Sequence, residues 1–349
     1  MKAWVLEDIG NIKYKEVLKP QISENEVLVQ VKAAGICGSD IPRIYQTGAH
    51  QMPLIPGHEF AGQVVQTGEN ADAKWRNKRV GIFPLIPCWK CIACIKGQYE
   101  LCRNYSYLGS RRDGGFAEYV AVPERNLIEL PENVSYEEAA MLEPMSVACH
   151  ALRRVKVSPD DTVAVCGLGT IGMFIVMLLL ERNVKNLLVI GNKAFQKEKI
   201  LKLGIKEEQY CDSKCENAEV WLDKKTGGIG ADVFFECVGK NETCSLAINH
   251  AAPGGKVCLV GNPYSDMLLD KQVYWKILRN QLTVTGTWNS SFTGEVTDDW
   301  HMIVHLLKEK KIDPAQFISH RYTLEELNRG FEIMRDKSED YIKIMAVME

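Results

Sequence analysis

The chain of 349 residues lacks the features that mark several large classes of protein. It has no basic excess, with 42 Lys and Arg against 45 Asp and Glu and a formal net charge of −3, which argues against nucleic-acid binding. Its longest apolar run, residues 173–180, is too short to span a bilayer. An apolar signal peptide, an internal repeat and a low-complexity segment are also absent. We therefore expect a globular cytoplasmic protein that binds neither membranes nor nucleic acid.

The composition is that of an ordinary globular protein, with 46% hydrophobic and 25% charged residues, and the length suits two domains. Up to about residue 150, short runs such as 26–33 alternate apolar and polar residues, which predicts a mostly β domain. Apolar runs and helical patterns then alternate, which predicts an α/β, doubly wound parallel sheet. Strands are expected at 162–166, 186–190, 231–236, 256–260 and 282–287, and helices at 171–181 and 195–203.

Cysteine is abundant, at 12 residues, and four of them form the pattern C-x2-C-x2-C-x7-C: Cys88, Cys91, Cys94 and Cys102. Four thiolates at this spacing can enclose one zinc ion and leave no coordination position open, which predicts a structural site. Pro84, Pro87 and Gly97 predict an irregular lobe without helix or strand. Seven scattered cysteines are expected to be small buried apolar residues: Cys149, Cys166, Cys211, Cys215, Cys237, Cys244 and Cys258.

A glycine-rich turn, Gly167-Leu168-Gly169-Thr170-Ile171-Gly172, lies between an expected strand and an expected helix. In that context G-x-G-x-x-G is typical of a dinucleotide site, where backbone N–H groups at the helix start face a pyrophosphate. A plain glycine turn is the alternative. The pattern predicts that an NAD(P) cofactor binds here.

An acidic residue about twenty positions further on normally binds the adenosine ribose in NAD sites. This sequence has Gly191, Asn192 and Lys193 there, so no carboxylate would repel a 2′-phosphate and Lys193 could pair with one. The sequence therefore favours NADP(H). Glycine also tolerates NAD, and Lys193 as a solvated surface residue is the alternative.

Cys37, His58, Glu59 and Glu143 are of types that bind zinc, and a catalytic zinc takes three protein ligands with one open position. Their spacing alone cannot bring these segments together, and a lone Cys or His is more often structural. The grouping comes from a resemblance to the zinc-containing medium-chain dehydrogenase/reductase family. It covers nearly the whole chain and rests on residues 35–40, 57–59, 114–119 and 143–144, the four-cysteine lobe and the glycine turn.

The resemblance implies a GroES-like partly open β-barrel catalytic domain, at 1–149 and 289–349 with a structural zinc lobe at 84–103, and a Rossmann domain at 150–288, with a cleft between them. It implies that Cys37, His58 and Glu143 bind a catalytic zinc. Glu59 would be a neighbouring carboxylate that can enter or leave the coordination shell, and Ser39 would pass on the proton of the substrate hydroxyl. A turn residue that only bonds the backbone is the alternative for Ser39. A dimer or tetramer joined through the Rossmann sheets is also implied.

The stretches 37–50, 109–119 and 276–288 most resemble the galactitol-1-phosphate 5-dehydrogenases, in the sorbitol dehydrogenase-like polyol branch. A polyol phosphate needs a cationic partner for its phosphate, and Arg43, Arg111 and Arg112 are the candidates. Ordinary ion pairing or packing is the alternative role for these arginines. Dehydrogenases of threonine, sorbitol or another unphosphorylated alcohol, a cofactor-binding protein without turnover, and a nucleic-acid-binding zinc protein are the alternative functions.

Overall fold

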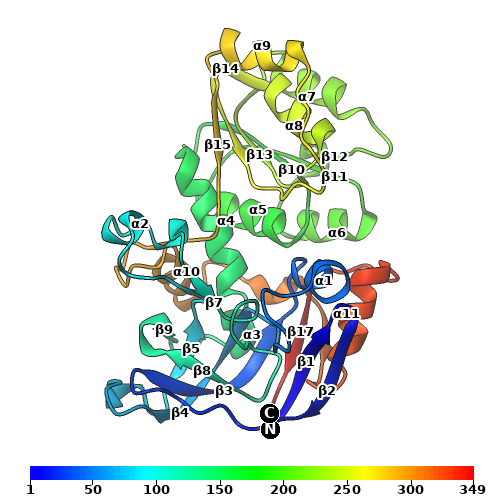
Figure 1. Ribbon diagram of the computed structural model, residues 1–349. Helices are drawn as coiled ribbons and strands as arrows, with labels where there is room; N and C mark the ends of the chain where they lie inside the picture. The colour runs from blue at the N-terminus through cyan, green and yellow to red at the C-terminus, as the bar shows by residue number, and fades with distance from the viewer. The chain divides into compact units, whose positions relative to one another are not determined.

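The computed structural model describes all 349 residues, which form two compact units (Figure 1). Unit 1 consists of Met1–Ser146 and Ser290–Glu349, and unit 2 is Val147–Asn289. Helix α4 (Leu142–Val155) carries the chain from unit 1 into unit 2. No helix combines the length and the apolar character that crossing a membrane requires.

Unit 1 is mostly β. Its strands are β1 (Lys2–Asp8), β2 (Asn11–Glu16), β3 (Glu26–Gly35), β4 (Glu59–Thr67), β5 (Arg79–Ile82), β6 (Leu85–Ile86), β7 (Ser106–Tyr107), β8 (Tyr119–Pro123), β9 (Leu127–Glu129), β16 (Ile318–Tyr322) and β17 (Lys343–Val347). Besides α4, its helices are α1 (Asp40–Pro42), α2 (Ile92–Ile95), α3 (Tyr136–Ala140), α10 (Asp299–Lys308) and α11 (Leu327–Asp336). Seven strands form one sheet in the order β16-β17-β3-β4-β5-β9, with β8 also paired to β3, and β1-β2 and β6-β7 form two small hairpins.

Strand β3 organises unit 1 because most of its apolar residues are buried in the core. Val27, Val29 and Val31 alternate into one buried cluster, as a strand with one face on a core requires. Strand β17, from the end of the chain, pairs antiparallel with β3, with Met345 opposite Gly35. The last strand thus lies beside the segment that leads into Cys37.

Unit 2 contains a six-stranded parallel sheet in the order β12-β11-β10-β13-β14-β15, which confirms the predicted doubly wound sheet. Its strands are β10 (Thr162–Cys166), β11 (Asn186–Gly191), β12 (Tyr210–Asp212), β13 (Ala231–Glu236), β14 (Ala251–Leu259) and β15 (Thr283–Gly286). Its helices are α5 (Thr170–Glu181), α6 (Ala194–Lys202), α7 (Ala218–Thr226), α8 (Asn241–Asn249) and α9 (Lys271–Arg279). Figure 1 shows α5 and α6 on one side of the sheet and α7 and α8 on the other. Both faces are therefore covered, and the central strands read as nearly continuous apolar runs.

The structure differs from the sequence-based expectations at a few points. Strand β12 and helices α7, α8 and α9 were not predicted, because β12 has only three residues and the mixed charges of α7 obscure its apolar face. Ile92–Ile95 forms a single helical turn, so the expectation of a lobe without helix was wrong there. Cys215 is exposed and Cys237 half-buried, whereas the other five scattered cysteines are buried.

Candidate functional site

Three of the predicted ligands lie together because β3 and β4 are paired strands. Their antiparallel register sets Gly35 opposite Glu59, so Cys37, just beyond β3, lies near His58 at the start of β4. The potential ligand atoms of Cys37, His58 and Glu59 are all within 4.8 Å of one another. Gly57, with φ +94°, makes the preceding turn, and a Cβ there would lie 2.6 Å from the Phe116 ring. The sheet register therefore assembles what sequence spacing could not.

Glu143, at the start of α4, lies close to this cluster but outside its 4.8 Å group. The Tyr107 hydroxyl donates a hydrogen bond of 3.1 Å to Glu143 Oε1. Burial raises the pKa of Glu143 to about 7; the nearby His58 opposes this rise and the Glu59 carboxylate adds to it. The charges of His58 and Glu59 therefore influence the pKa of Glu143, whose side chain is hydrogen-bonded to Tyr107.

Asp40 lies between the cluster and the Arg43 guanidinium. It is completely buried, its Oδ2 accepts from the Cys37 backbone N–H at 3.0 Å, and its Oδ1 lies 3.4 Å from His58 Nδ1. Arg43 donates to the same Oδ1 at 2.6 Å. His58 Nδ1 is buried and makes no hydrogen bond at this distance, so Asp40 acts on the ring through its charge. A carboxylate beside one imidazole nitrogen can orient the ring and leave the other nitrogen for a metal. Asp40 belongs to the quoted 35–40 motif, yet the sequence did not reveal this role.

Glu59 is engaged by a lysine from the far end of the chain. Lys343 Nζ lies 2.5 Å from Glu59 Oε2 and donates to the Ile36 carbonyl at 3.2 Å, and both side chains are 1% exposed. Burial favours neutral Lys343, but the Glu59 carboxylate outweighs it and raises the pKa of Lys343. This contact was not predicted from the sequence, since Lys343 is the first residue of an otherwise apolar strand.

The donor set of this cluster suits zinc. Sulfur, imidazole nitrogen and carboxylate oxygen are its usual protein ligands. Burial would lower the pKa of His58, but the Asp40 carboxylate and the Cys37 sulfur outweigh it and hold the pKa of His58 well above its usual value. The pocket therefore favours positive charge. Ser39 is exposed, and its hydroxyl donates to Cys37 Sγ at 3.4 Å.

The four-cysteine lobe has the dimensions of a tetrahedral sulfur site. Cys91 and Cys94 lie on one helical turn with their sulfurs 3.5 Å apart, and the Cys88–Cys94 and Cys91–Cys102 sulfur pairs are 4.0 and 3.9 Å apart. A tetrahedron with Zn–S bonds of about 2.3 Å has edges of about 3.8 Å. All four thiols are free of disulfides. The residues therefore fit one zinc ion.

The glycine turn has the form that a dinucleotide site needs. Gly167 has φ +98°, and a Cβ on Gly172 would lie 1.9 Å from the Gly167 carbonyl oxygen, so helix and strand approach closely only because Gly172 has no side chain. A Cβ on Gly169 would meet nothing within 4 Å, so that side of the turn is open. Helix α5, with Thr170 and Ile171 in its first turn, starts here without a side-chain cap. Its backbone is suited to a phosphate.

At the end of β11, Gly191 is followed by Asn192 and by Lys193, which precedes α6. Ser213, after β12, donates from its hydroxyl to the Gly191 carbonyl at 3.1 Å. No carboxylate occupies this end of β11 itself, as the sequence indicates.

The three candidate arginines differ sharply in their partners. Arg112 pairs with Glu26 at 2.5 Å, and Arg43 pairs with Asp40. Arg111 forms no ion pair: its guanidinium lies 4.7 Å from the centre of the Tyr105 ring, and its Nε is buried without a hydrogen-bond partner. The structure thus leaves the charge of Arg111 without a counter-charge.

Arg111 and Arg43 act on the same neighbour. The pKa of His50 is lowered by burial and, to a smaller extent, by the charges of Arg111 and Arg43. Both cations therefore lie near that imidazole. Tyr105 contacts Tyr107 at a ring distance of 6.2 Å, and Tyr107 in turn bonds Glu143. Ring contacts through Tyr105 and Tyr107 thus connect Arg111 to Glu143. The sequence did not identify His50 or Tyr107.

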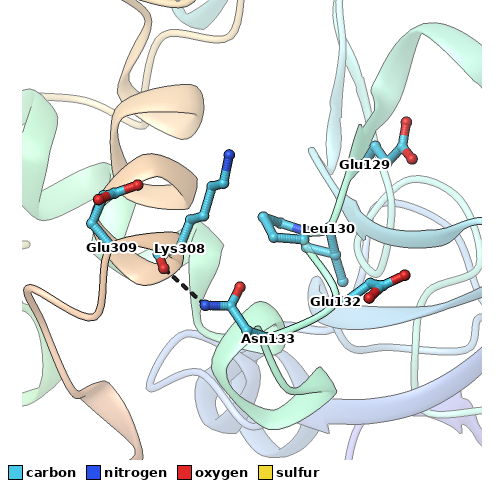
Figure 2. Close-up of a pocket in the computed structure, with 7 residues that line it drawn as sticks. Glu129, Leu130, Glu132, Asn133, Lys308 and Glu309 are labelled. Atoms are coloured by element: carbon cyan, nitrogen blue, oxygen red, sulfur yellow. Dashed lines mark hydrogen bonds between the residues drawn. The ribbon is translucent and has the colours of Figure 1, made fainter.

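Two cavities of unit 1 lie away from the predicted ligands. One of about 590 Å³ is open and lined by residues 129–133 with Lys308 and Glu309, where the Asn133 amide donates to the Lys308 carbonyl (Figure 2). Another, of about 450 Å³, is lined by aromatic residues such as Trp75 and Trp89 together with charged and aliphatic ones. Neither contains a predicted ligand or a cluster of metal-binding side chains.

Two family models match the chain. Residues 23–132 match the alcohol dehydrogenase GroES-like domain, and residues 170–309 match the zinc-binding dehydrogenase domain. The chain is 32% identical to galactitol 1-phosphate 5-dehydrogenase of Escherichia coli K12, over 93% of this chain and 94% of that protein. It is 33% identical to L-idonate 5-dehydrogenase of Vitis vinifera, over 95% and 90% of the two chains. It is 30% identical to L-threonine 3-dehydrogenase of Bacillus licheniformis, over 90% of each.

Solved structures share this fold along the whole chain. The crystal structure of galactitol-1-phosphate dehydrogenase from Escherichia coli matches with a TM-score of 0.92 and 31% identity, over 100% of both chains. A zinc-binding dehydrogenase of Sinorhizobium meliloti 1021 bound to NADP matches with a TM-score of 0.90 and 27% identity, over 99% of both. An alcohol dehydrogenase of Escherichia coli CFT073 complexed with NADH matches with a TM-score of 0.89 and 26% identity, over 100% of this chain and 99% of that one. These matches confirm the predicted GroES-like and Rossmann folds.

Proposed function

Since the chain belongs to the zinc-binding medium-chain dehydrogenases and is thus a zinc- and nicotinamide-dependent alcohol or polyol dehydrogenase, we propose that it oxidises a polyol phosphate to the corresponding ketose phosphate. The substrate would resemble galactitol 1-phosphate, and its secondary alcohol would give a hydride to the nicotinamide. The observation that carries this proposal is Arg111, which forms no ion pair and is connected to Glu143 by contacts through Tyr105 and Tyr107.

The proposal assigns the catalytic zinc to Cys37, His58 and Glu143. Zinc supplies a Lewis acid that makes the substrate hydroxyl easier to deprotonate. Asp40 holds His58 in the orientation that leaves one ring nitrogen for the metal. Ser39, exposed and next to Cys37, takes the proton of the substrate hydroxyl onto Oγ and releases its own toward solvent. Glu143, which accepts a hydrogen bond from Tyr107, would be the third protein residue to hold the metal.

Glu59 keeps its proposed role as a carboxylate that can enter or leave the metal shell. Its Oε2 is paired with Lys343. Glu59 would have to leave this ion pair before it could bind the metal. The second zinc, in the proposed lobe at Cys88, Cys91, Cys94 and Cys102, shapes the chain and takes no part in the reaction. We further propose that unit 1 is the GroES-like catalytic domain and unit 2 the Rossmann domain.

The phosphate of the substrate would bind to Arg111, with Arg43 as a second cation. A guanidinium matches the geometry of a phosphate, and one without a carboxylate partner has its full charge to offer. Arg43 would share its charge with Asp40, and Arg112 is engaged with Glu26. We therefore expect the contribution to phosphate binding to fall in the order Arg111, Arg43, Arg112.

Kinetics with two adjacent variants test the phosphate site. We expect Arg111→Gln to raise KM for galactitol 1-phosphate by about a hundredfold, as loss of a charge-assisted contact would, and to leave KM for free galactitol unchanged. Arg112→Gln is the matched control and should change neither value by more than about threefold. Equal rates of the wild-type enzyme with phosphorylated and free polyol would contradict the proposal.

An unphosphorylated alcohol is the second candidate substrate. Two of the three arginines have carboxylate partners, and relatives of similar identity are named for idonate and threonine. Turnover of sorbitol or threonine at a higher kcat/KM than galactitol 1-phosphate would favour this candidate.

For the cofactor we propose a preference for NADP(H). Gly191 and Asn192 offer no carboxylate to repel a 2′-phosphate, and Lys193 follows them. The two cofactor-bound structures with this fold contain NADP and NADH respectively, so the fold accommodates both. Comparison of kcat/KM for the two cofactors is the test, and a strong preference for NAD would contradict the proposal.

We also propose a homo-oligomer, a dimer or tetramer, joined through unit 2. Strand β15 ends the six-stranded sheet, and the neighbouring α9 exposes Tyr274, Trp275 and Leu278 to 53, 43 and 58%. An open sheet edge beside exposed apolar side chains suits pairing with a second copy. Light scattering after gel filtration should report a molar mass of two or four times 39.3 kDa. Val284→Lys on β15 should lower this molar mass.

A further inference from the structure

The four-cysteine lobe exposes large apolar side chains that its metal site does not need. Helix α2 and the loops beside it expose 41, 64, 72 and 50% of four residues: Trp89, Ile92, Ile95 and Leu101. Figure 1 shows α2 at the outer edge of unit 1. Single exposed apolar residues are ordinary, but a group of them within one short segment is typical of an interaction site.

The same segment is cationic, although the chain as a whole has a net charge of −3. Residues 84–103 contain one carboxylate, Glu100, which is buried. Three of their side chains are exposed cations that form no ion pair: Lys90, Lys96 and Arg103. A fourth exposed cation, Arg125, lies with its guanidinium 5.2 Å from the centre of the Trp89 ring. We call these four cations and the four apolar residues the lobe surface.

Trp89 also lines the cavity of about 450 Å³ described above. Its ring contacts the edge of the Tyr99 ring at 4.8 Å between centres. Further aromatic walls come from distant segments of unit 1: Trp75, Phe292 and His301. A cavity of this size with aromatic walls can accept an aromatic side chain.

Arg125 is the one charge in the wall of this cavity that has no polar partner. Glu129 pairs with Lys78 at 2.6 Å, and Glu124 Oε2 accepts from the Asp72 backbone N–H at 2.7 Å. The His301 ring is bonded to a carboxylate as well. The free charge at the cavity is therefore positive, like the rest of the lobe surface.

The backbone of Trp89 supports a role for its side chain. Its φ is +61°, in the left-handed region that bulky residues rarely adopt. The turn between Cys88 and Cys91 would be made at lower cost by glycine or asparagine. Neither the turn nor the core therefore accounts for a tryptophan here, and such outliers are typical of functional positions.

We propose that the lobe surface docks an acidic segment of another protein, with one aromatic side chain of that segment inserted in the cavity. The carboxylates of the segment would pair with the four cations, which gives the complementary charge. Its apolar groups would cover Ile92, Ile95 and Leu101. The buried aromatic side chain would be the main anchor, as is usual in protein interfaces.

Other occupants fit the lobe surface less well. A closed dimer through the lobe would set the same surface against itself, and the positive charges of the two copies would repel one another. A bilayer has no side chain to fill the cavity. A nucleic-acid strand would leave the three aliphatic side chains without apolar partners.

Fluorescence anisotropy of a labelled random copolymer of glutamate and tyrosine measures docking to the full-length, zinc-loaded protein. Polyglutamate is the reference without an aromatic anchor, and its Kd should be at least about tenfold higher. Trp89→Asn should raise the Kd for the copolymer at least about tenfold, because the indole wall is lost. Lys96→Glu should raise it at least about fivefold, and added salt should weaken binding.

The variants are designed to leave the fold intact. Asparagine tolerates the left-handed conformation at position 89, so the melting temperature of Trp89→Asn should not fall. Ile95→Ser, at a residue that is 72% exposed, is a second apolar variant and should also weaken docking. The controls are Leu18→Asn, at a residue that is 94% exposed, and Lys224→Glu on α7; neither should change the Kd.

Several results would overturn the proposal. Equal Kd values for the two polymers would show that charge alone is recognised, and a Kd that stays the same in the lobe variants would place binding elsewhere. Tighter binding of phosphatidylglycerol vesicles or of oligothymidylate, with the same loss in Trp89→Asn, would assign the surface to a membrane or to nucleic acid. A lower molar mass of Lys96→Glu in light scattering would assign it to a second copy of this chain.

Discussion

The two proposed zinc sites of unit 1 are built in opposite ways. The lobe takes four identical sulfur ligands from residues 88–102, and its geometry is fixed by one helical turn and short loops. The reactive cluster takes sulfur, nitrogen and oxygen from separate segments and surrounds them with buried charges, of which Asp40 and Lys343 are the nearest. A site that only binds a metal can be local, whereas a site that must also react depends on groups that the fold brings from far away.

The largest expected effect is a loss of turnover without a loss of stability. Cys37→Ser should lower kcat/KM by roughly a thousandfold or more, because the metal contributes several kcal/mol to the transition state. Zinc content should fall from about two to about one per chain, with little change in melting temperature. Exposed Cys215→Ser is the control. Normal turnover with normal zinc content in Cys37→Ser would end this assignment.

Cys91→Ser should lower the stability of the protein and not act directly on turnover. Loss of one thiolate from a closed sulfur site should lower the free energy of unfolding by on the order of several kcal/mol, because metal binding there is coupled to folding. Urea unfolding together with zinc analysis measures both effects. The fraction that remains folded should keep its catalytic zinc. A stable variant with no turnover would instead assign the reactive metal to the lobe.

Lys343→Met tests the buried charge around the reactive cluster. Removing the lysine leaves Glu59 charged and buried, which should cost about 3–5 kcal/mol in the free energy of unfolding. The double variant with Glu59→Gln should recover at least about half of that loss. Lys78→Met breaks the exposed pair with Glu129 and should cost less than about 1 kcal/mol. Equal losses for the buried and the exposed pair would show that Lys343 does not hold Glu59.

Asp40→Asn should weaken the catalytic zinc selectively. A group that orients a metal-binding histidine typically contributes about 10–100-fold to metal affinity. Competition with a chelator, followed for both zinc ions, should show earlier release from the reactive site and unchanged release from the lobe. Unchanged affinity at both sites would reduce Asp40 to a structural partner of Arg43.

The smallest effect is expected for Arg112→Gln, at about 1 kcal/mol of unfolding free energy or less, because the pair with Glu26 is partly exposed. Burial raises the pKa of Glu26, but hydrogen bonds from the Ser23 backbone and from Arg112 outweigh burial and lower this pKa below its ordinary value of 4.5. The stabilisation is therefore present above about pH 4.5 and is lost as the pH falls through the lowered value. Urea unfolding of both proteins between pH 7 and pH 4 should show their difference shrink only at the acid end. A difference that grows toward acid pH would contradict this.

Sequence reasoning succeeded where a feature is complete within a short segment. The strands 162–166 and 231–236 were predicted with their observed bounds, because central parallel strands are short apolar runs between turns. The family resemblance supplied Cys37 and His58. Strand β12 was missed, because three residues give no periodicity.

The sequence by itself determined the four-cysteine lobe and the glycine turn, because their ligands and glycines lie a few residues apart and any fold that keeps those segments keeps the chemistry. Only the tertiary structure decided which charges surround the metal and which arginine is left without a counter-charge. Lys343 and Glu59 are 284 residues apart, and Arg112 and Glu26 are 86 apart. Such contacts follow from sheet register and burial, which exist only once the whole chain has folded.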